Sequence, residues 1–307
     1  MIADLKPEAI THQIKDELVI ATAFSGRMRG IAVQSTQTVT DLMRVHDLSP
    51  ISTIALGRFA IGAQLMAGDL KNDDASMSIT LRCDGPLGGM VVAAEPTSYV
   101  RGYAFNPRVS LEPRPEDGKI HFRDAVGAGS LTVVKNLGVR EPYSGTVDLI
   151  SGEIAEDLAY YLAASEQIPS VLAAGVLVNE TGVVCAGGLL IQLLPGYTEE
   201  DVNYIERRAA GFPDVTFWLQ QGFTASQLLD LFFGDKNLKY LEQRPIGFCC
   251  PCSRERMERN LLAIGKADLI ELAEDSNGIN LECHFCNSHY HFDQKEVQAL
   301  VAAKDRR

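Results

Sequence analysis

The sequence contains no long uninterrupted apolar run, and residues of positive charge are scarce in it. Residues 51–66 and 171–194 are its most apolar stretches, but Arg58 and Gln64 interrupt the first and a polar turn at 179–182 interrupts the second. Neither stretch is therefore expected to span a membrane. Lys and Arg together number 28 against 40 Asp and Glu, which gives a formal net charge of −12. Because this charge repels phosphate backbones, a general nucleic-acid binder is also disfavoured.

The first 20 residues lack the apolar core of a signal peptide, because acidic and basic residues recur through them. We therefore expect a cytoplasmic location. In that reducing compartment, the seven Cys residues are not expected to form a disulfide scaffold.

Sequence motifs of common enzyme classes are missing as well, including the G-x-S-x-G, H-E-x-x-H and kinase patterns. Gly127-Ala128-Gly129 begins like a dinucleotide-binding fingerprint, but Thr132 stands where the third Gly belongs. Residues 83–89 are rich in Gly but lack the Lys and the Ser or Thr of a phosphate-binding loop. Both segments are interpreted as turns, and no enzymatic activity is predicted.

Residues 1–195 mix strand and helix patterns without a regular alternation. A period of two, typical of strands, runs from Tyr99 to Phe105, and Ser49 followed by Pro50 marks the start of a long helix. Strands are predicted over 17–24, 28–34, 77–82, 90–94, 99–105, 131–134, 171–178 and 183–194, and helices over 40–46, 50–67 and 153–162. This mixture predicts an α+β core domain.

Residues 196–240 form a predicted helical linker. Capping patterns begin at Thr198 and Thr224, each ahead of apolar residues with helical spacing. The segment is also rich in large apolar side chains, among them Phe217, Trp218, Leu219, Phe223, Leu228, Leu229, Leu231, Phe232 and Phe233. We expect these side chains to pack on neighbouring elements at rest. The alternative is a surface that becomes exposed when a partner element lets go.

Residues 241–307 form the third predicted domain and contain five of the seven Cys. Helices are predicted over 254–264, 267–274 and 297–303, and strands over 279–282 and 289–292, on either side of a tight turn. Because the core of so short a segment is small, an additional staple is expected to secure its fold.

The Cys residues of this third domain come in two close pairs. Cys250-Pro251-Cys252 is followed, after 30 intervening residues, by Cys283-His284-Phe285-Cys286. Two thiol pairs on separate turns can converge into a tetrahedral site of four sulfurs, which is the geometry that Zn²⁺ prefers in structural positions. The spacing therefore predicts one bound Zn²⁺.

The ligand register of the first turn is open from spacing alone. Cys249 precedes Cys250, so that a C-x-x-C reading would use Cys249 and Cys252 instead of Cys250 and Cys252. His284, His289 and His291 are close enough in sequence to be alternative ligands. Because four thiols are already present, we interpret these histidines as strand residues or as residues that contact the ligands. Single Cys residues in apolar strand patterns, interpreted as core thiols, are Cys83 and Cys185.

Thiolates around a metal ion are held deprotonated and can be oxidised. A sulfenic acid formed on one of them is within reach of a neighbouring thiolate, which closes a disulfide and ejects the metal. Since the metal supplies much of the folding free energy of a small metal-binding domain, this oxidation is expected to unfold much of residues 241–307.

The sequence resembles the redox-regulated bacterial holdase of the 33-kilodalton heat-shock family along nearly its whole length. The residues that carry this resemblance are Phe248-Cys249-Cys250-Pro251-Cys252-Ser253, Cys283-His284-Phe285-Cys286-Asn287 and Tyr290-His291-Phe292, together with Ala21-Thr22-Ala23, Leu56-Gly57-Arg58, Asp84-Gly85-Pro86-Leu87-Gly88 and Gly129-Ser130-Leu131-Thr132-Val133 with Lys135. The C-x-C and C-x-x-C pair is the specific element, and the resemblance implies that Cys250, Cys252, Cys283 and Cys286 are zinc ligands. Cys249 is an addition to the usual pattern.

The resemblance also implies a function that the residues alone do not show. Members of the family are inactive chaperones when reduced and zinc-bound. Oxidation pairs Cys250 with Cys252 and Cys283 with Cys286, releases zinc, and unfolds the C-terminal domain and the linker before it. The exposed apolar surface then holds unfolding client proteins without ATP, generally as a homodimer.

Two alternative functions remain open at this point. A thiol-disulfide oxidoreductase would use Cys249 and Cys252 as a redox pair, although the expected βαβ setting is absent around them. A zinc-ribbon module would bind nucleic acid or a protein partner, and the acidic charge balance predicts weak affinity for nucleic acid.

Overall fold

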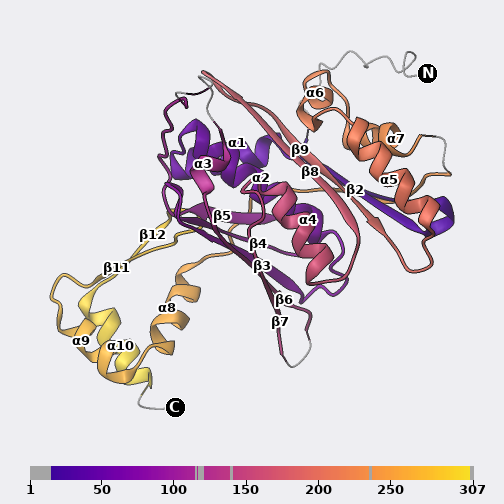
Figure 1. Ribbon diagram of the computed structural model, residues 1–307. Helices are drawn as coiled ribbons and strands as arrows, with labels where there is room; N and C mark the ends of the chain where they lie inside the picture. The colour runs from indigo at the N-terminus through magenta and orange to yellow at the C-terminus, as the bar shows by residue number, and fades with distance from the viewer. Residues whose placement is uncertain (1–14, 115, 117–120, 139–140, 235–236, 305–307) are drawn as a thin grey trace. The chain divides into compact units, whose positions relative to one another are not determined.

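The computed structural model describes residues 15–114, 116, 121–138, 141–234 and 237–304 (Figure 1). The chain divides into two compact units, Met1–Cys249 and Cys250–Arg307. Helices and strands are intermixed along the chain. The predicted α+β class is confirmed.

The first unit is built on two antiparallel five-stranded sheets. Sheet A has the order β10 (Lys239–Pro245), β1 (Glu17–Ala23), β2 (Met28–Gln34), β9 (Gly182–Leu193), β8 (Ser170–Asn179). Sheet B has the order β5 (Val100–Ala104), β4 (Gly89–Ala94), β3 (Ser76–Cys83), β6 (Gly129–Asn136), β7 (Tyr143–Asp148). A short 3₁₀ turn, η1 (Phe24–Gly26), joins β1 to β2 and completes the predicted hairpin.

Helix α2 (Pro50–Ala67) is the centre of the first unit, and strands of both sheets contact it. It begins as predicted, because the Ser49 side chain accepts a hydrogen bond from the Ser52 backbone N–H at 3.3 Å and Pro50 occupies the first turn. Two glycines allow close packing: a Cβ on Gly57 would lie 2.8 Å from Val176, and one on Gly62 would lie 2.2 Å from Leu158. The helix is therefore a tightly enclosed part of the core.

Three further helices pack around this core: α1 (Thr36–His46), α3 (Arg123–Val126) and α4 (Ala155–Ala164). Helix α1 starts four residues before the predicted Thr40, and a distant side chain explains the difference. The buried Asp16 carboxylate accepts hydrogen bonds from the backbone N–H groups of Gln37 and Thr38, at 3.0 and 2.6 Å. A carboxylate from outside the helix thus satisfies its first amides, and no pattern within residues 36–40 reveals it.

Sheet A is apolar on both faces. Along β1, Leu18 and Ile20 join the main core around α2, whereas Val19 and Ala21 belong to a second apolar cluster on the opposite face. Helices α5 (Glu199–Gly211), α6 (Val215–Gln220) and α7 (Ala225–Phe233) supply the other side of that second cluster. The structure confirms that the apolar helical segment packs on its neighbours at rest.

Strands β7 and β10 were not expected from the sequence. Both lie at the edge of a sheet and both carry mainly exposed side chains, so their apolar patterns are weak. Strand β10 also extends across the predicted boundary at residues 240 and 241, and the compact unit continues to Cys249. The division into domains 1–195, 196–240 and 241–307 stays a prediction.

The second unit contains α8 (Arg254–Ala263), α9 (Lys266–Glu274), the hairpin β11 (Ile279–Glu282) and β12 (His289–Phe292), and α10 (Gln294–Lys304). Its buried apolar cluster is small and consists of Met257, Leu261, Leu269, Ala273, Cys283, Phe292 and Val297. One of these residues is itself a member of the Cys pairs, so that the core and the candidate metal site are continuous.

The two Gly-rich segments that the sequence analysis discounted are connections between elements. Gly127, with φ of 72°, ends α3, and Gly88 and Gly89, with φ of 68° and 147°, lie where β3 turns into β4. Within the part of the chain that the structure describes, no helix combines the length and apolar character needed to cross a membrane.

Candidate functional site

The structure brings the sulfurs of Cys250, Cys252, Cys283 and Cys286 within 4.8 Å of one another. The Sγ atoms of Cys250 and Cys283 are 3.7 Å apart, and those of Cys252 and Cys286 are 3.2 Å apart. Four thiolates at about 2.3 Å from a tetrahedral Zn²⁺ would lie about 3.8 Å from one another. The donor set and its spacing fit such an ion, so this cluster could hold a metal.

The second Cys pair is positioned by a tight turn between β11 and β12. The backbone N–H of Cys283 donates to the Ser288 carbonyl at 2.9 Å, and the N–H groups of Cys286 and Asn287 donate to the Cys283 carbonyl at 3.1 and 2.7 Å. Asn287 takes the left-handed conformation, with φ of 55°, which Asn tolerates better than most residues. This compact turn places both sulfurs on the same side of the chain.

The first Cys pair precedes α8, whose N-cap is Ser253, as predicted. The Ser253 hydroxyl accepts a hydrogen bond from the Arg256 backbone N–H at 3.2 Å. Cys249 is exposed and lies outside the cluster, and its backbone N–H donates to the Val100 carbonyl at 2.9 Å. The spacing leaves two ligand registers open, and the sulfurs that cluster in the structure are those of the register that contains Cys250.

Two polar side chains of the hairpin contact the cluster, and the sequence analysis did not assign them a role. The Tyr290 hydroxyl lies 3.1 Å from the Cys252 sulfur, and the Ser288 hydroxyl lies 3.2 Å from that of Cys286. Tyr290 alternates with the exposed His289 and His291 along β12. That period of two is a signal that could have identified Tyr290 as inward-facing.

The three histidines do not belong to the cluster of candidate ligands found among the described residues. His289 and His291 are exposed on β12, and the His291 Nδ1 lies 2.9 Å from Asn280 Oδ1 on the neighbouring strand. His284 lies between the two Cys of the second turn. All four candidate ligand atoms are therefore sulfurs.

The pKa values of three of the thiols depart from the ordinary value for Cys, and they do so in different directions. Burial raises the pKa of Cys250 and that of Cys283. Burial acts in the same sense on Cys286, but contacts with the Ser288 hydroxyl and the Cys252 sulfur outweigh it and lower the pKa of Cys286 to about 7. The cluster thus contains a sulfur that ionises near neutral pH beside others that resist ionisation.

The two isolated Cys residues lie in the sheets of the first unit. Cys185 is buried in the second cluster of sheet A, where burial raises the pKa of its thiol. Cys83 is half-buried at the end of β3 and packs against the main core, and burial raises its pKa too. Both have the surroundings of the predicted core thiols.

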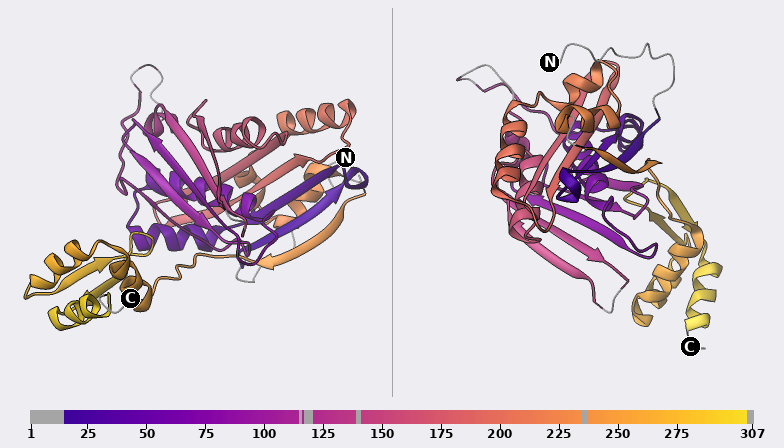
Figure 2. Two further views of the ribbon diagram at one scale, coloured as in Figure 1. Left: turned by 90° about the horizontal axis from the view of Figure 1, so that it is seen from below. Right: turned by 90° about the vertical axis from the view of Figure 1, so that its right-hand side faces the viewer.

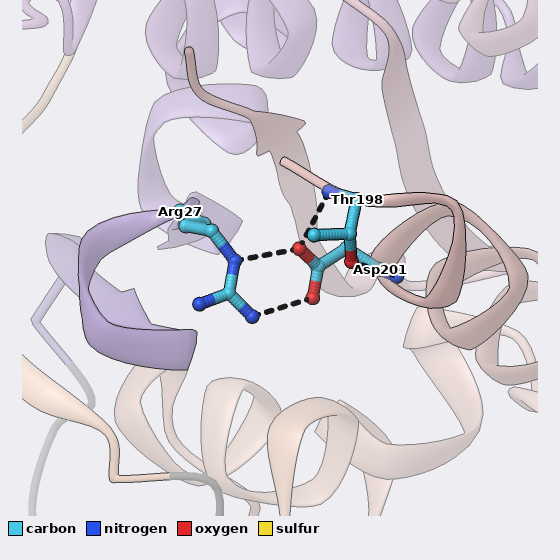
Figure 3. Close-up of polar contacts among 3 residues, drawn as sticks. All are labelled: Arg27, Thr198 and Asp201. Carbon is cyan, nitrogen blue, oxygen red and sulfur yellow. Dashed lines mark hydrogen bonds and ion pairs between the residues drawn. The ribbon is translucent and has the colours of Figure 1, made fainter. Parts of the chain in front are cut away.

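An ion pair joins helix α5 to the hairpin of β1 and β2 (Figure 3). The Arg27 guanidinium donates from Nε and Nη2 to the two carboxylate oxygens of Asp201, at 2.7 and 3.0 Å. Asp201 also closes the predicted capping box of α5, because it accepts from the Thr198 backbone N–H at 2.9 Å. The Asp201 side chain is only 2% exposed. Its hydrogen bonds with Arg27 lower its pKa to about 2, against the effect of burial.

Polar contacts also hold α5 to α7 and the segment before α7 to sheet A. The Tyr204 hydroxyl of α5 donates to the Phe233 carbonyl at 2.8 Å, and the Arg208 Nε donates to the Phe232 carbonyl at 2.7 Å. The buried Gln34 side chain of β2 donates to the Phe223 carbonyl at 3.2 Å. Apolar packing against sheet A is thus reinforced by a small number of specific polar contacts.

Comparisons with known proteins agree with this arrangement. A family model described as "Hsp33 protein" matches residues 16–293. The "33 kDa chaperonin" of Ruminiclostridium cellulolyticum is 45% identical over 286 residues, which cover 93% of this chain and 98% of the relative. That of Acetivibrio thermocellus is 42% identical over 289 residues, which cover 94% of this chain and 97% of the relative.

A solved structure is similar over nearly the whole length. It is the 33 kDa chaperonin, a heat shock protein 33 homologue, of Thermotoga maritima, with a TM-score of 0.85 and 34% sequence identity. The match covers 96% of this chain and 100% of that one. With the family model matched from β1 through β12 and relatives aligned almost end to end, this chain belongs to the Hsp33 family.

Proposed function

We propose that this protein is a redox-regulated holdase chaperone that binds unfolding client proteins without ATP. In this proposal Cys250, Cys252, Cys283 and Cys286 are zinc ligands in the reduced, inactive state. Oxidation joins them into disulfides and exposes apolar surface that holds clients. The family and the names of the relatives support a chaperone.

The observation that carries the proposal is the second apolar face of sheet A. Its residues are contributed by β1, β2 and β9, and they are packed against α5, α6 and α7 of the proposed linker. If the linker lost its order, both the face of the sheet and the apolar sides of these helices would become accessible. Such a surface suits the exposed apolar segments of unfolding proteins.

The small second unit supplies the proposed switch. A bound zinc ion would cross-link the turn before α8 to the turn between β11 and β12. The buried cluster of the unit is short and includes Cys283, so its fold depends on that link. Strand β10 and residues 246–249 lie between the linker and the second unit and bond to the first unit. The proposal therefore requires the unfolding of the second unit to spread through these residues to the linker.

The proposed oxidation pairs Cys250 with Cys252 and Cys283 with Cys286. Each disulfide formed by peroxide takes two electrons and two protons from a pair of thiols and yields two molecules of water. None of the four sulfurs then remains available as a thiolate ligand. The sulfur contacts at 3.7 and 3.2 Å join Cys residues of different turns. The proposed disulfides within each turn therefore rest on the resemblance to the family, and disulfide mapping of the oxidised protein tests them.

The proposal is tested by comparing the reduced, zinc-loaded protein with the peroxide-treated protein in suppressing aggregation of a heat-labile client. Zinc content and free thiols are counted before and after oxidation. We expect suppression only after treatment, with loss of zinc and of four thiols. Equal activity of the two forms would refute the switch.

Cys249→Ser provides the matched control, because Cys249 is exposed and adjacent to the cluster but outside it. This variant is expected to keep the zinc and the oxidation response of the parent protein. Cys283→Ser, which removes a buried member of the cluster, is expected to lose zinc in the reduced state and to be active without oxidation. The oxidised state is also proposed to be a homodimer, which a mass measurement in solution tests.

A further inference from the structure

Strand β10 closes an edge of sheet A, next to β1. The two strands are antiparallel, from the pair Glu17 and Pro245 to the pair Thr22 and Lys239, with a register shift between Ile20 and Ala21. In the left view of Figure 2, β10 is the orange strand that runs beside the indigo β1. The edge of β1 is therefore shaped to accept an antiparallel strand, and in the resting structure the protein's own chain occupies it.

The two paired strands differ in how they are held. Leu18, Val19 and Ala21 of β1 are almost completely buried, on both faces of the sheet. On β10, Tyr240 is 48% exposed and Leu241 is 62% exposed. Strand β10 therefore buries little apolar surface, and backbone hydrogen bonds and polar side chains hold it in place.

The polar contacts of β10 reach elements on both sides of it. The Tyr240 hydroxyl donates to Asp230 Oδ1 of α7 at 2.6 Å and to the Ser226 carbonyl at 3.2 Å. The Gln243 amide donates to Glu17 of β1 at 2.7 Å, and Arg244 donates to the Pro96 carbonyl at 2.7 Å. The hydrogen bonds of Tyr240 and Gln243 are at exposed positions and exchange with water at small net cost, while that of Arg244 is partly buried. So few bonds are not expected to hold the strand once its flanks have lost order.

Both flanks of β10 belong to segments that the proposed function requires to lose order. Helix α7 precedes it, and residues 246–249 follow it and bond to the first unit. The backbone N–H groups of Ile246 and Cys249 donate to the carbonyls of Asp16 and Val100, at 3.2 and 2.9 Å. Once α7 and these bonds are lost with the unfolding of residues 241–307, β10 separates from β1 and leaves the backbone N–H and C=O groups of β1 unpaired.

The edge so exposed lacks the usual protection against further pairing. Sheet edges are normally guarded by Lys, other charges or Pro. Strand β10 has such residues in Lys239, Glu242, Arg244 and Pro245, whereas the sequence of β1, ELVIATA, has a single charge at Glu17 and no Pro. An apolar segment would also gain more than β10 from the apolar side chains on both faces of β1.

We propose that the edge of β1 is a binding site for an extended apolar segment of an unfolding client, which adds to sheet A as an antiparallel strand in place of β10. Backbone hydrogen bonds would hold the segment regardless of its sequence, while its side chains pack beside those of β1. In the resting state β10 is an internal competitor for this site. The inference rests on the proposed function and specifies how part of the client is held.

The test uses the oxidised full-length protein and a fluorescent seven-residue apolar peptide, which matches the length of β1. Two further versions of the peptide carry N-methyl groups, one on alternate residues and the other on every residue. In strand addition the N–H groups of alternate residues face the sheet, so the first version keeps one edge that can pair and the second keeps none. Fluorescence anisotropy is expected to show the parent peptide and the alternately methylated version bound, and the fully methylated version at least about tenfold weaker, as for the loss of three or more hydrogen bonds of about 0.5 kcal/mol each.

Hydrogen exchange of the β1 amides provides the second measurement. Oxidation is expected to increase exchange at amides that face β10, and the bound peptide is expected to slow it again. Equal binding of the two methylated peptides, or exchange that the peptide does not alter, would overturn the inference. A second copy of the chain on this edge would protect these amides without peptide and block the parent peptide, which would also overturn it.

Aggregation assays on the same preparation separate this inference from the proposed function. If the oxidised protein suppresses aggregation but does not distinguish the methylated peptides, the strand-addition site fails and the holdase stands. If it does not suppress aggregation at all, the proposed function fails.

Discussion

In the first compact unit, helix α2 is buried against both sheets and a continuous apolar core surrounds it. In the second, three helices and a short hairpin enclose a small apolar cluster that includes one of the four grouped cysteines. Apolar burial grows with the size of the unit, so a small unit needs an additional link to reach the same stability. The two units therefore differ in what can stabilise them: the first has a large apolar core, whereas in the second four sulfurs lie beside a small one. In the proposed function a metal bound to these sulfurs supplies the additional link.

The same contrast appears between the two faces of sheet A. One face packs on α2, which is buried in the core. The other face packs on α5, α6 and α7, which precede the two Cys pairs in the chain. Both faces carry similar apolar side chains. How firmly each face of sheet A stays covered therefore depends on the helices packed on it. Variants on the two faces can test this difference.

Removal of the metal is expected to have the largest effect. A chelator added to the reduced protein should unfold residues 250–304, because structural zinc contributes on the order of 10–16 kcal/mol of apparent binding free energy to a small domain. Hydrogen exchange followed by mass spectrometry would show loss of protection there, while β3 and β6 of sheet B stay protected. Unchanged protection of residues 250–304 would contradict the dependence on metal.

Two neighbouring leucines of β9 compare the faces of sheet A directly. Leu190 lies in the main core and Leu189 in the cluster beneath the linker helices, and each is 1% exposed. Substitution by Ala should cost about 2–5 kcal/mol at either position. Leu190→Ala is expected to lower the melting temperature of the core, whereas Leu189→Ala is expected to speed hydrogen exchange of residues 199–233. The comparison breaks down if both variants change the same measurement equally.

Loss of the ion pair at α5 is expected to have the smallest effect. Asp201→Asn should weaken linker docking by about 1–2 kcal/mol, less than the full pKa shift implies, because water screens the 37% exposed Arg27. The folded-state pKa of about 2 lies below the ordinary Asp value of 3.8, so this contribution is present above about pH 4 and is lost as the pH falls toward 2. Exchange rates of the linker should differ between variant and parent at neutral pH and converge in acid.

Asp47→Asn is the matched control for that prediction. Asp47 forms an ion pair with Arg108 in which both side chains are more than 70% exposed, and surface pairs of this kind contribute little. Its linker exchange should equal that of the parent. An equal effect of the two substitutions would mean that Asp201 acts through net charge and not through its contact with Arg27.

What the sequence predicted was mainly local. The caps at Ser49, Ser253 and Thr198 and the β11–β12 hairpin depend on residues a few positions apart, and the structure confirms them. The two Cys pairs lie together in the structure, and the bound Zn²⁺ stays a prediction. The register of the first turn did not follow from spacing, because Cys249 and Cys250 both satisfy it. The contact that places Cys249 elsewhere is with Val100, in a distant strand.

Long-range partners explain the other differences. Asp201 was predicted as a capping residue, but its partner Arg27 lies 174 positions away. Strand β10 was not predicted because its exposed, polar residues do not show the pattern of a buried strand. It is a strand because it pairs with the neighbouring β1. The pairing of the disulfides and the domain boundaries stay predictions.

The enclosed helix α2 has a consequence for the proposed switch. Because Gly57 and Gly62 fit it closely to its surroundings, a shifted packing of the core would be sterically costly, and the core is expected to stay folded if oxidation disorders the linker and the second unit. On return of reductant and metal, only those segments would then refold, on an intact core. The same molecule is therefore expected to serve through repeated cycles without synthesis of a replacement.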